Sequence, residues 1–511
     1  MLISIIGHSW APIFGRNGGI LISLLDLKTA THLPNTTSLP FPENKANELE
    51  SIEVMPGTAQ ETGNTLVRVG AATTNERLRR WCVKNKKLTL PINVIMVEIT
   101  IGGSNAPMCH GAGRRHQTLS DLVRVIEYVD ANGTLQKVTD AKQLKAAAGS
   151  FGLLGIVTHL TLEFQPMTYA NMKPTKIPVM QAVPPPPGMP DSEIPPALFV
   201  KRTAEERAKD QETFEKRAND DFYSEWFWFP YSDYSWVNCW SDTPDSSNAK
   251  PFPDDLHIFL AFVQTFTLNV LQMTPLLGRL IDAVQLNEAA VTLTSRAAMF
   301  ALPDKPVKTY VTDALHFQRA IQNVRVRDVE IEMPLVPRKD DAKKVDYTLV
   351  QKAWWDAILV VYKYRETCPM RMPLEMRIMG SSDIVLAAQR GNDLGTCSIE
   401  VLTLHSARDI WHGFAQEVVD TWMSLRQHES LLDEKSGQKR ELNIRPHWAK
   451  EWKEFSVDGK PWPQVVRETS CRGQIEEFRG LVEDIAKAQG WTVADGRKRF
   501  GNEFLEGLIW T

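Results

Sequence analysis

Three glycine-rich segments lie in the first part of the chain, and they constrain its fold more than any other feature. The first is Gly7-His8-Ser9, the second runs from Gly102 to Gly113, and the third from Gly149 to Val157. Glycine has no Cβ, so backbone N–H groups in such turns can approach an extended anionic ligand closely. Spacing alone leaves ordinary turns as an open alternative for each segment. Three such loops in one region favour a site for a cofactor-sized anion.

Length and charge exclude several classes of protein. With 511 residues, 43% of them hydrophobic, the chain can form two or three domains with cores of their own. Its 58 basic and 62 acidic residues give a formal charge of −4 without a concentrated basic patch, so nucleic acid is not expected as a partner. Six scattered cysteines, without a C-x-x-C pair or a histidine cluster, predict free thiols in a reducing compartment and no metal site: Cys82, Cys109, Cys239, Cys368, Cys397 and Cys471.

Two domains joined by a proline-rich connector are predicted. The first alternates strands and helices, with a strand at Thr65 to Val69 and a helix at Thr73 to Val83. A break at Gln165-Pro166 widens into Val183 to Gly188, whose consecutive prolines fit neither a sheet nor a helix. The predicted boundaries are therefore a domain at 1–165, a proline-rich and charged connector at 166–220, and a second domain at 221–511.

The second domain is predicted to contain a sheet and helices, which makes the fold class α+β. Strand character is strongest at Phe222 to Trp240, Leu374 to Met379 and Cys397 to Leu404. Helices are predicted at Lys201 to Asp220, Tyr347 to Tyr364 and Ala407 to Arg426, and a further one is expected to open at Thr118 in the first domain.

The sequence shows no secretory address, because the apolar start Met1 to Ile6 is too short for a signal peptide. The most hydrophobic uncharged run, 257–278, is interrupted by polar residues and proline. A spanning helix needs about 20 predominantly apolar residues, so this run is predicted to be a buried or groove-lining helix, with contact to a membrane surface as the alternative. An intracellular protein is expected.

Taken together, the three loops resemble those of the vanillyl-alcohol oxidase (PCMH-type) FAD flavoproteins, and the likeness extends over most of the chain to their D-arabinono-1,4-lactone oxidase and L-gulonolactone oxidase branch. In that family G-x-G-H-S is the pyrophosphate loop, the second loop ends in T-H-G-x-G, and G-x-x-G-I-V contacts the nucleotide part of FAD. Here Cys109 replaces the usual threonine. The resemblance implies FAD as cofactor, held by Gly7, His8, Ser9, Gly102, Gly103, Ser104, Asn105, Cys109, His110, Gly111, Gly113, Gly152, Gly155, Ile156 and Val157.

The resemblance also implies a two-subdomain FAD-binding domain, followed by a substrate domain of antiparallel sheet flanked by helices whose C-terminal segment returns to the flavin. His8 occupies the place at which the family often attaches FAD covalently; a purely hydrogen-bonding role is the alternative. Family members carry a strand-helix-strand segment before this loop, so this sequence resembles an N-terminally shortened form.

Candidate catalytic residues come from two motifs. Glu375 and Arg377 stand at i and i+2 of a predicted strand, which puts both side chains on one face about 7 Å apart. A solvated ion pair is the alternative, and the resemblance matches them to an E-x-R pair that faces the flavin ring. His447-Trp448-Ala449-Lys450 matches a family H-W-x-K motif whose lysine lies near the isoalloxazine, with a surface turn as the alternative. Glu400, on another predicted strand, is expected to be structural.

The resemblance implies oxidation of a CH–OH group of a sugar-derived substrate, with D-arabinono-1,4-lactone oxidase as the most similar activity. The partners would be a sugar lactone or polyol and O2, with hydrogen peroxide as product. Alternatives are an alditol or other carbohydrate oxidase, a dehydrogenase with a protein acceptor, and a non-catalytic remnant that binds FAD weakly. A cytoplasmic protein, or one peripheral to a mitochondrial membrane, fits the family.

Overall fold

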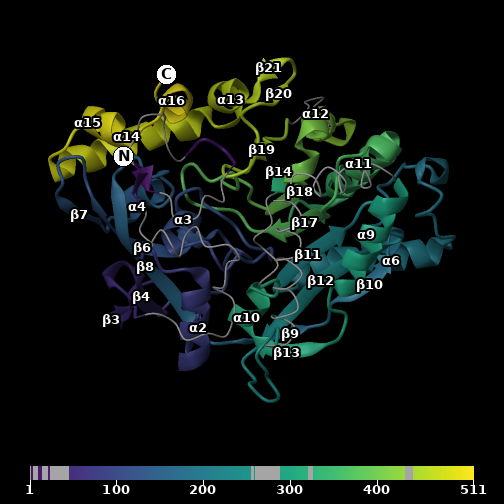
Figure 1. Cartoon of the computed structure of the whole chain (residues 1–511), viewed down its shortest axis with the longest axis horizontal. Coiled ribbons are helices and arrows are strands. Elements are labelled where there is room, and N and C mark those ends of the chain that lie inside the picture. The colour runs from purple at the N-terminus through teal and green to yellow at the C-terminus, as the bar shows by residue number, and fades with distance from the viewer. Residues whose placement is uncertain are drawn as a thin grey trace.

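The computed structural model describes residues 2–3, 10–13, 21–22, 45–254, 258, 288–319, 326–431 and 441–511. The first glycine loop, Gly7-His8-Ser9, lies outside the described residues, and so does the hydrophobic run 257–278 apart from Ile258. The architecture is α+β, as predicted, with two antiparallel sheets side by side (Figure 1).

The first sheet is built from the predicted first domain. Its order is β3 (Ile52–Thr58), β4 (Thr65–Gly70), β8 (Ile156–Pro166), β6 (Val123–Val129) and β7 (Leu135–Val138), and β5 (Leu88–Thr89) also pairs with β8. The predicted helix is α2 (Asn75–Asn85), whose first turn is capped by the Thr74 side chain accepting from Arg77 N–H.

The helix expected at Thr118 is wrong. Leu119–Leu122 forms only a 3₁₀ turn, closed by reciprocal hydrogen bonds between Thr118 and Asp121, and the chain then enters β6. The sequence V-R-V-I-E-Y-V explains the difference, because its alternating β-branched and apolar side chains favour a strand over a helix. The capping signal was real, but the residues after it could not continue a helix.

The second sheet has the order β13 (Val307–Tyr310), β9 (Tyr169–Met172), β12 (Tyr234–Thr243), β11 (Tyr223–Trp228), β17 (Leu374–Met379), β18 (Thr396–Leu404), β14 (Val326–Pro334) and β19 (Arg445–Pro446). β10 (Thr175–Pro178) also pairs with β12. Two strands from 169–178, within the predicted connector, thus contribute to this sheet. The prolines at 184–187 follow a single helical turn, α5 (Val179–Ala182), and precede the charged helix α6 (Ala204–Asp220).

The two faces of the second sheet differ in polarity. Odd-numbered residues of β18, such as Ile399 and Val401, are fully buried in the main hydrophobic core, where α11 (Thr348–Tyr364) and α12 (Arg408–Ser424) cover them. Figure 1 shows these two helices beside β17 and β18. The opposite face carries the charged residues of the strands, and His110 of the second glycine loop approaches this face.

The C-terminal segment crosses back to the first sheet. Helix α14 (Arg472–Gln489) packs on α4 (Ala141–Ala147), and Tyr128 of β6 donates a hydrogen bond to Gln489. Figure 1 shows α14, α15 (Val493–Phe500) and α16 (Glu503–Leu505) along one edge of the molecule, above the first sheet. The chain end therefore ties the two sheets together.

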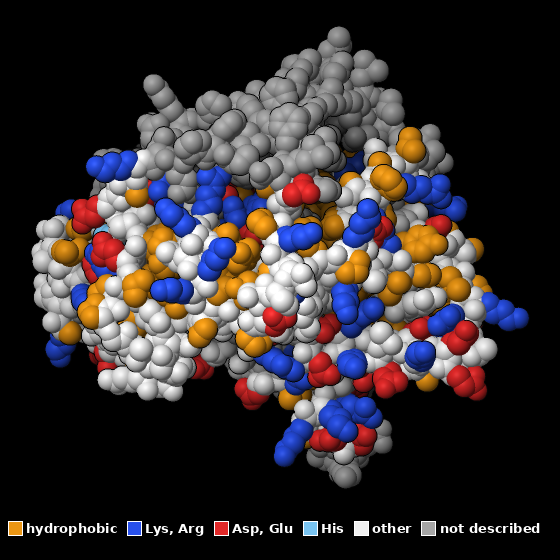
Figure 2. All heavy atoms as spheres, turned by 90° about the horizontal axis from the view of Figure 1, so that it is seen from below, with side chains coloured by type: hydrophobic (Ala, Val, Ile, Leu, Met, Phe, Trp, Pro, Cys, Tyr) orange, Lys and Arg blue, Asp and Glu red, His pale blue; other side chains and the backbone are white. Residues whose placement is uncertain are grey.

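No helix among the described residues is long and apolar enough to cross a membrane. One face of the molecule carries scattered Lys and Arg side chains with Asp, Glu and hydrophobic side chains between them (Figure 2). All six cysteines are free thiols, as predicted.

Candidate functional site

Two rungs of the second sheet define the site. Direct cross-strand pairing aligns Glu225, Arg377, Ser398 and Glu332 in one rung, and Phe227, Glu375, Glu400 and Glu330 in the next. Paired residues of an antiparallel sheet point to the same face. The period-two pattern of β17 and β18 therefore collects charged side chains from four strands on the face opposite the helices.

Arg377 is held by carboxylates on three strands. Its Nε donates to Glu225 at 2.8 Å and its Nη1 to Glu400 at 2.8 Å, and its Nη2 also donates to Glu375. Burial alone would lower the pKa of Arg377, but these carboxylates raise it well above its usual value. For Glu375, burial is the main cause of a pKa well above the ordinary range, despite the attraction of Arg377. The pair predicted from i, i+2 spacing is therefore real.

Lys450 occupies the other end of the same network. Its Nζ lies 2.5 Å from Glu400 Oε2 and 3.2 Å from Glu330 Oε2, and it also donates to Asp328. Burial opposes its charge, but the three carboxylates raise the pKa of Lys450 well above the usual value. Three N–H bonds therefore face three carboxylates, so Lys450 acts as a fixed positive charge.

The three predicted catalytic residues are the ones that retain exposure. Side-chain exposure is 12% for Glu375, 11% for Arg377 and 17% for Lys450. The acids behind them, Glu225, Asp328, Glu330 and Glu400, are at most 3% exposed. Glu375, Arg377 and Lys450 thus form the accessible layer, and the other acids support it.

The second glycine loop brings His110 to the same face. His110 Nε2 lies 2.9 Å from Glu330 Oε1, 3.3 Å from Glu332 Oε1 and 3.2 Å from the Ser398 hydroxyl. Gly113 N–H donates to Ile378 O at 2.7 Å, which fastens the end of the loop to β17. Gly113 has φ +102°, and a Cβ there would overlap the Phe222 carbonyl. The close approach therefore requires glycine.

Residues of the second and third loops, together with Trp10, converge on residues 447–450. Phe151 of the third loop donates its N–H to Ala106 O of the second loop at 3.3 Å, and its ring contacts Trp448 edge-on with centroids 5.2 Å apart. Trp10, directly after the first loop, donates its N–H to Ala449 O at 2.8 Å. The Trp10 ring also lies under Lys450 Nζ, 5.3 Å from its centroid. The H-W-x-K segment therefore contacts the second and third predicted cofactor loops and Trp10.

The second loop has polar groups suited to a polar cofactor. It begins with the short helix α3 (Ile101–Asn105), which includes Gly102 and Gly103. Ser104 Oγ and Asn105 Oδ1 are buried and find no hydrogen-bond partner among the described residues. Because buried polar atoms are normally satisfied, this loop fits FAD. Cys109 and Gly111 are also buried, and a Cβ on Gly111 would meet Ile92 at 2.6 Å.

The third loop turns into β8 through two glycines of positive φ, Gly152 at +76° and Gly155 at +154°. Gly155 is packed against the Val129 carbonyl, and Ile156 and Val157 then begin β8 in partly buried positions. The glycine turn therefore leads directly into a strand. Which atoms of FAD these residues contact stays a prediction.

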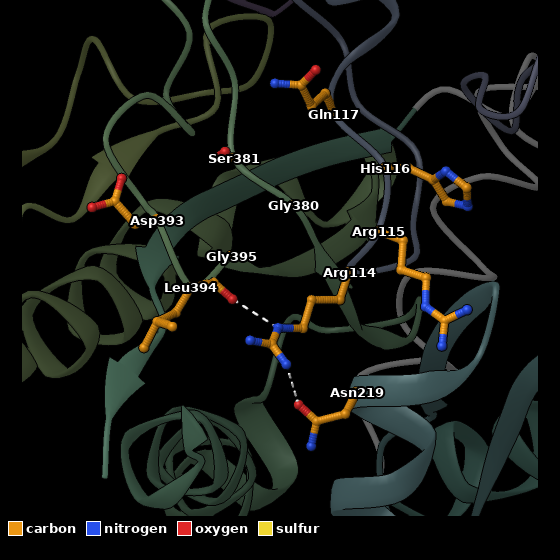
Figure 3. Close-up of a pocket in the computed structure, with 10 residues that line it drawn as sticks. All are labelled: Arg114, Arg115, His116, Gln117, Asn219, Gly380, Ser381, Asp393, Leu394 and Gly395. Atoms are coloured by element: carbon orange, nitrogen blue, oxygen red, sulfur yellow. Dashed lines mark hydrogen bonds between the residues drawn. The ribbon is translucent and has the colours of Figure 1, made fainter. Parts of the chain in front are cut away.

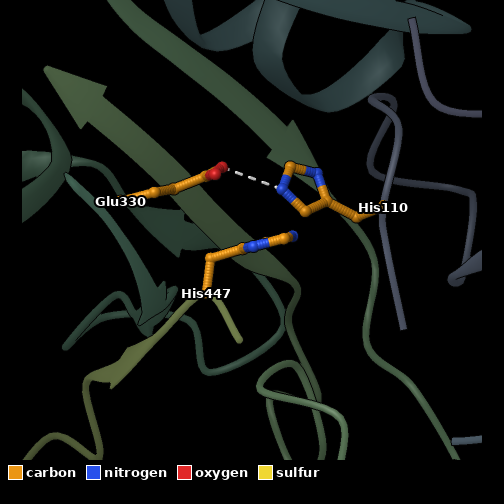
Figure 4. A group of neighbouring side chains, drawn as sticks. All are labelled: His110, Glu330 and His447. Carbon is orange, nitrogen blue, oxygen red and sulfur yellow. Dashed lines mark hydrogen bonds and ion pairs between the residues drawn. The ribbon is translucent and has the colours of Figure 1, made fainter. Parts of the chain in front are cut away.

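Two imidazoles and a carboxylate also meet in this site. Nitrogen or oxygen atoms of His110, Glu330 and His447 lie within 4.8 Å of one another, and all three residues are buried (Figure 4). The hydrogen bonds do not favour a cation there, because His447 Nδ1 accepts Ala449 N–H at 3.2 Å. A neutral His447 then carries its proton on Nε2 and has no free lone pair. Lys450 already neutralises Glu330 as well.

A separate polar cavity of about 390 Å³ lies beyond the end of β17. Arg114 is fixed in its wall by hydrogen bonds to Leu394 O at 2.8 Å and Asn219 Oδ1 at 2.6 Å (Figure 3). None of the predicted site residues lines this cavity. Its wall combines Arg114 and Arg115 with Asp393, so its charge is mixed.

The spacing of residues in the sequence did not predict several groups of the site. Asp328, Glu330 and Glu332 alternate along β14, a strand that was not predicted, although the run V-R-D-V-E-I-E-M has the period of a strand with one polar face. Glu225 lies in the aromatic segment Phe222 to Trp240, which was predicted to form strand, but it was not named as a site residue. Glu400 was expected to be structural, and in the structure it accepts from both Arg377 and Lys450.

Comparison with known proteins agrees with this arrangement. Residues 196–398 match the family model "Cholesterol oxidase, substrate-binding". L-gulono-1,4-lactone dehydrogenase of Mycobacterium tuberculosis is 22% identical over 396 residues, covering 76% of this chain and 73% of the relative. Alditol oxidase of a Streptomyces species is 31% identical over 138 residues, which is 27% of this chain and 32% of that enzyme.

Among solved structures, cholesterol oxidase from B. sterolicum has a TM-score of 0.67 at 16% identity, covering 99% of this chain and 89% of that one. A solvent-stable cholesterol oxidase has a TM-score of 0.63, also at 16% identity. These structures share the fold, a cofactor domain followed by a substrate domain. These similarities support a flavoenzyme with FAD as its cofactor, similar to those of the vanillyl-alcohol oxidase (PCMH) family, and at these identities no branch is assigned.

Proposed function

We propose that this protein oxidises a CH–OH group of a sugar-derived substrate, most closely as a D-arabinono-1,4-lactone oxidase does, with O2 as acceptor and hydrogen peroxide as product. The observation that carries the proposal is the partly exposed set Glu375, Arg377 and Lys450, backed by buried carboxylates on one face of the substrate sheet. A wall of fixed donors and acceptors suits a substrate rich in hydroxyl or lactone oxygens, because each buried polar group then keeps a partner.

The chain's own residues have separable tasks. Arg377 and Lys450 supply positive charge, which lowers the cost of forming an alkoxide at the substrate hydroxyl. Glu375 faces Glu400 across β17 and β18, and because burial raises the pKa of Glu375, its ionised form is the stronger base of the two and can take the hydroxyl proton. Bound FAD supplies the acceptor for the hydride from the carbinol carbon, and O2 then takes up two electrons and two protons as hydrogen peroxide.

The matched relatives support the substrate class in a general way. One is named a gulonolactone dehydrogenase and the other an alditol oxidase, so both are named for sugar-like alcohols or lactones. They also keep two alternatives open within the class, an alditol oxidase and a dehydrogenase that passes electrons to another acceptor. A non-catalytic remnant with weak FAD binding is the third alternative.

A second candidate substrate, an alcohol with a large apolar body, is favoured by one observation. Beyond the charged rungs the same face of the sheet becomes aromatic, because Tyr223, Phe227, Trp236 and Trp240 pair across β11 and β12. They join Val311, Leu315 and Phe317 in a second apolar cluster. The match of 196–398 to a cholesterol oxidase substrate-binding model agrees with this reading.

A substrate panel separates these possibilities. Purified holoenzyme is assayed for peroxide with aldonolactones, alditols and a sterol, and in parallel with an artificial electron acceptor. We expect peroxide with aldonolactones and little with the sterol. Turnover only with the artificial acceptor would indicate a dehydrogenase, and a preparation without the yellow flavin spectrum would support the remnant. Turnover of the sterol alone would overturn the sugar proposal.

Covalent attachment through His8 remains a separate proposal. It predicts flavin fluorescence on the polypeptide in a denaturing gel, lost in His8→Ala. A wild-type band without fluorescence would exclude covalent attachment and leave the proposed reaction unaffected, because non-covalent FAD can carry out the same oxidation.

A further inference from the structure

Two histidines of the site lie side by side in opposite hydrogen-bonding environments. The ring centroids of His110 and His447 are 5.2 Å apart, in an edge-to-face arrangement (Figure 4). Both side chains are buried, so solvent cannot satisfy whichever ring nitrogen lacks a protein partner. The partners of each nitrogen therefore determine where the protons are.

His110 is surrounded by acceptors. Its Nδ1 lies 2.9 Å from Gly111 O, and a carbonyl oxygen can only accept, so Nδ1 carries a proton. Its Nε2 lies 2.9 Å from Glu330 Oε1. The Ser398 hydroxyl also donates to this oxygen, so Oε1 of Glu330 acts as an acceptor. The proton between Oε1 and His110 Nε2 therefore belongs to Nε2. With a proton on each nitrogen, His110 is an imidazolium.

Glu330 is suited to remain ionised opposite this ring. Its other oxygen lies 3.2 Å from Lys450 Nζ. Burial would raise the pKa of Glu330, but Lys450 and His110 lower it well below its usual value. An ionised Glu330 thus pairs with two cations, the His110 imidazolium and the Lys450 ammonium. A neutral His110 would need no ionised partner.

His447 has the opposite arrangement. Its Nδ1 accepts Ala449 N–H at 3.2 Å, so this nitrogen carries no proton. Burial is the main cause that lowers the pKa of His447 to about 3, and His110 and Lys450 contribute because both are positive neighbours. The same site thus holds one cationic and one neutral imidazole.

We propose that His110 is an imidazolium at neutral pH, a third cation beside Arg377 and Lys450, and that it acts as a positioning residue by holding Glu330 against Lys450. The second glycine loop that carries His110 fits FAD, so its charge also favours the reduced, anionic form of that cofactor. The statement about the cofactor rests on the proposed function. The protonation state of His110 does not.

The groups around His110 agree with a standing charge. β14 contributes Glu330 and Glu332, β18 contributes Ser398 and Glu400, and β17 contributes Arg377. His447, Lys450 and the neighbouring Cys109 complete the surroundings. Burial opposes the charge, but Glu332 and Glu330 raise the pKa of His110 to about 9. Arg377 opposes it more weakly.

The test measures the imidazole directly in the FAD-loaded protein. Histidine is labelled with ¹³C and ¹⁵N, and side-chain spectra are recorded at pH 8, where an ordinary imidazole of pKa about 6.5 is almost fully neutral. We expect one imidazolium signal to persist at pH 8 and to disappear in His110→Gln. His447→Gln is the matched control and should retain that signal.

A second variant and a second measurement keep the test decisive if His110→Gln does not fold. Glu330→Gln leaves both histidines in place, and it should make the persistent signal titrate at a lower pH. The flavin midpoint potential should fall in His110→Gln and shift much less in His447→Gln, because only the first variant removes a charge. A wild-type protein whose histidines are all neutral at pH 8 would overturn the inference.

Two other outcomes are informative. Stoichiometric bound metal in the purified protein, lost with the signals of both histidines on chelation, would replace the imidazolium with a metal site. If the imidazolium is found but no sugar lactone or polyol is oxidised, the proposed function fails and the inference about His110 stands. If turnover occurs without the imidazolium, the reverse holds.

Discussion

Lys450 and Glu400 are joined by an ion pair of 2.5 Å, and the second oxygen of Glu400 accepts from Arg377 at 2.8 Å. One carboxylate therefore connects the two cations of the accessible layer. Burial and the nearby Glu330 would raise the pKa of Glu400, but Lys450 and Arg377 lower it to about 2. Glu400 is thus ionised at neutral pH, and it fixes the distance between the two cations.

Glu400→Gln should therefore impair catalysis beyond its effect on folding. The amide keeps one acceptor and turns an NH₂ group toward one of the two cations, so that cation loses its position. We expect kcat to fall at least about tenfold, as for a misplaced catalytic group, with a smaller change in KM. Steady-state kinetics on the folded, FAD-loaded variant measure the effect.

Glu76→Gln is a matched control for that variant. Glu76 is also a buried carboxylate between two cations, Arg79 and Arg80, but it lies on α2, away from the charged rungs. Comparable loss of stability in both variants, with kcat lowered only in Glu400→Gln, is the expected pattern. Equal kcat values for the two variants would reduce Glu400 to a structural ion pair.

Lys450→Met tests the fixed positive charge. The substitution leaves Asp328, Glu330 and Glu400 without their shared cation, and breaking a buried ion network by removing one partner costs roughly 3–5 kcal/mol. We expect a lower melting temperature and at least about tenfold lower kcat. Glu375→Gln should lower kcat similarly with little loss of stability, because Glu375 is partly exposed. Less than a tenfold loss in both variants would contradict the assignment.

The sequence predicts the fold well where one local signal decides the outcome. The i, i+2 spacing of Glu375 and Arg377 on an alternating strand placed both on one face, and β17 has the predicted bounds. The helix expected at Thr118 shows the limit of such signals, because a cap states where a helix can begin and not whether the residues after it will continue one.

The site itself depends on pairing between distant strands, which local patterns do not report. Glu225 and Arg377 are 152 positions apart, and His110 and Glu330 are 220 apart, yet each pair is hydrogen-bonded. The alternation of Asp328, Glu330 and Glu332 could have predicted a half-polar strand. Its position beside β18 follows only from the assembled sheet.

Stability should depend on pH at both ends of the range, for opposite reasons. The pKa of His447 is lowered to about 3, mainly by burial, so its contribution is present above the free imidazole value of about 6.5 and is lost as the pH falls through about 3. The pKa of Glu332 is raised to about 8 by burial, and that of His110 to about 9 by its carboxylate neighbours.

Glu332 and His110 stabilise the folded protein fully below the unfolded pKa of each group. This stabilisation is lost as the pH rises through their folded pKa values of about 8 and 9. The His447 contribution falls below pH about 6.5, and the Glu332 contribution begins to fall above its ordinary pKa of about 4.5, so melting temperatures measured from pH 4 to 10 should be highest between these values and decline toward pH 9. Glu332→Gln should flatten the alkaline decline, because an amide does not ionise. An alkaline limb as steep as that of the wild type would contradict the assignment to Glu332.

Gly155→Ala tests the turn that leads from the third loop into β8. Gly155 has φ +154°, and a Cβ there would overlap the Val129 carbonyl, so neither the backbone conformation nor the space admits alanine. We expect the free energy of unfolding in urea to fall by more than about 1 kcal/mol, with less FAD retained on gel filtration because the neighbouring loops pack on this turn.

Gly480→Ala is the control. Gly480 lies inside α14 with open space around its Cβ position, and alanine should stabilise that helix by about 0.5–1 kcal/mol. Equal stability of the two variants would show that the turn tolerates a side chain, and that Gly155 does not have to be glycine for the loop to approach β6.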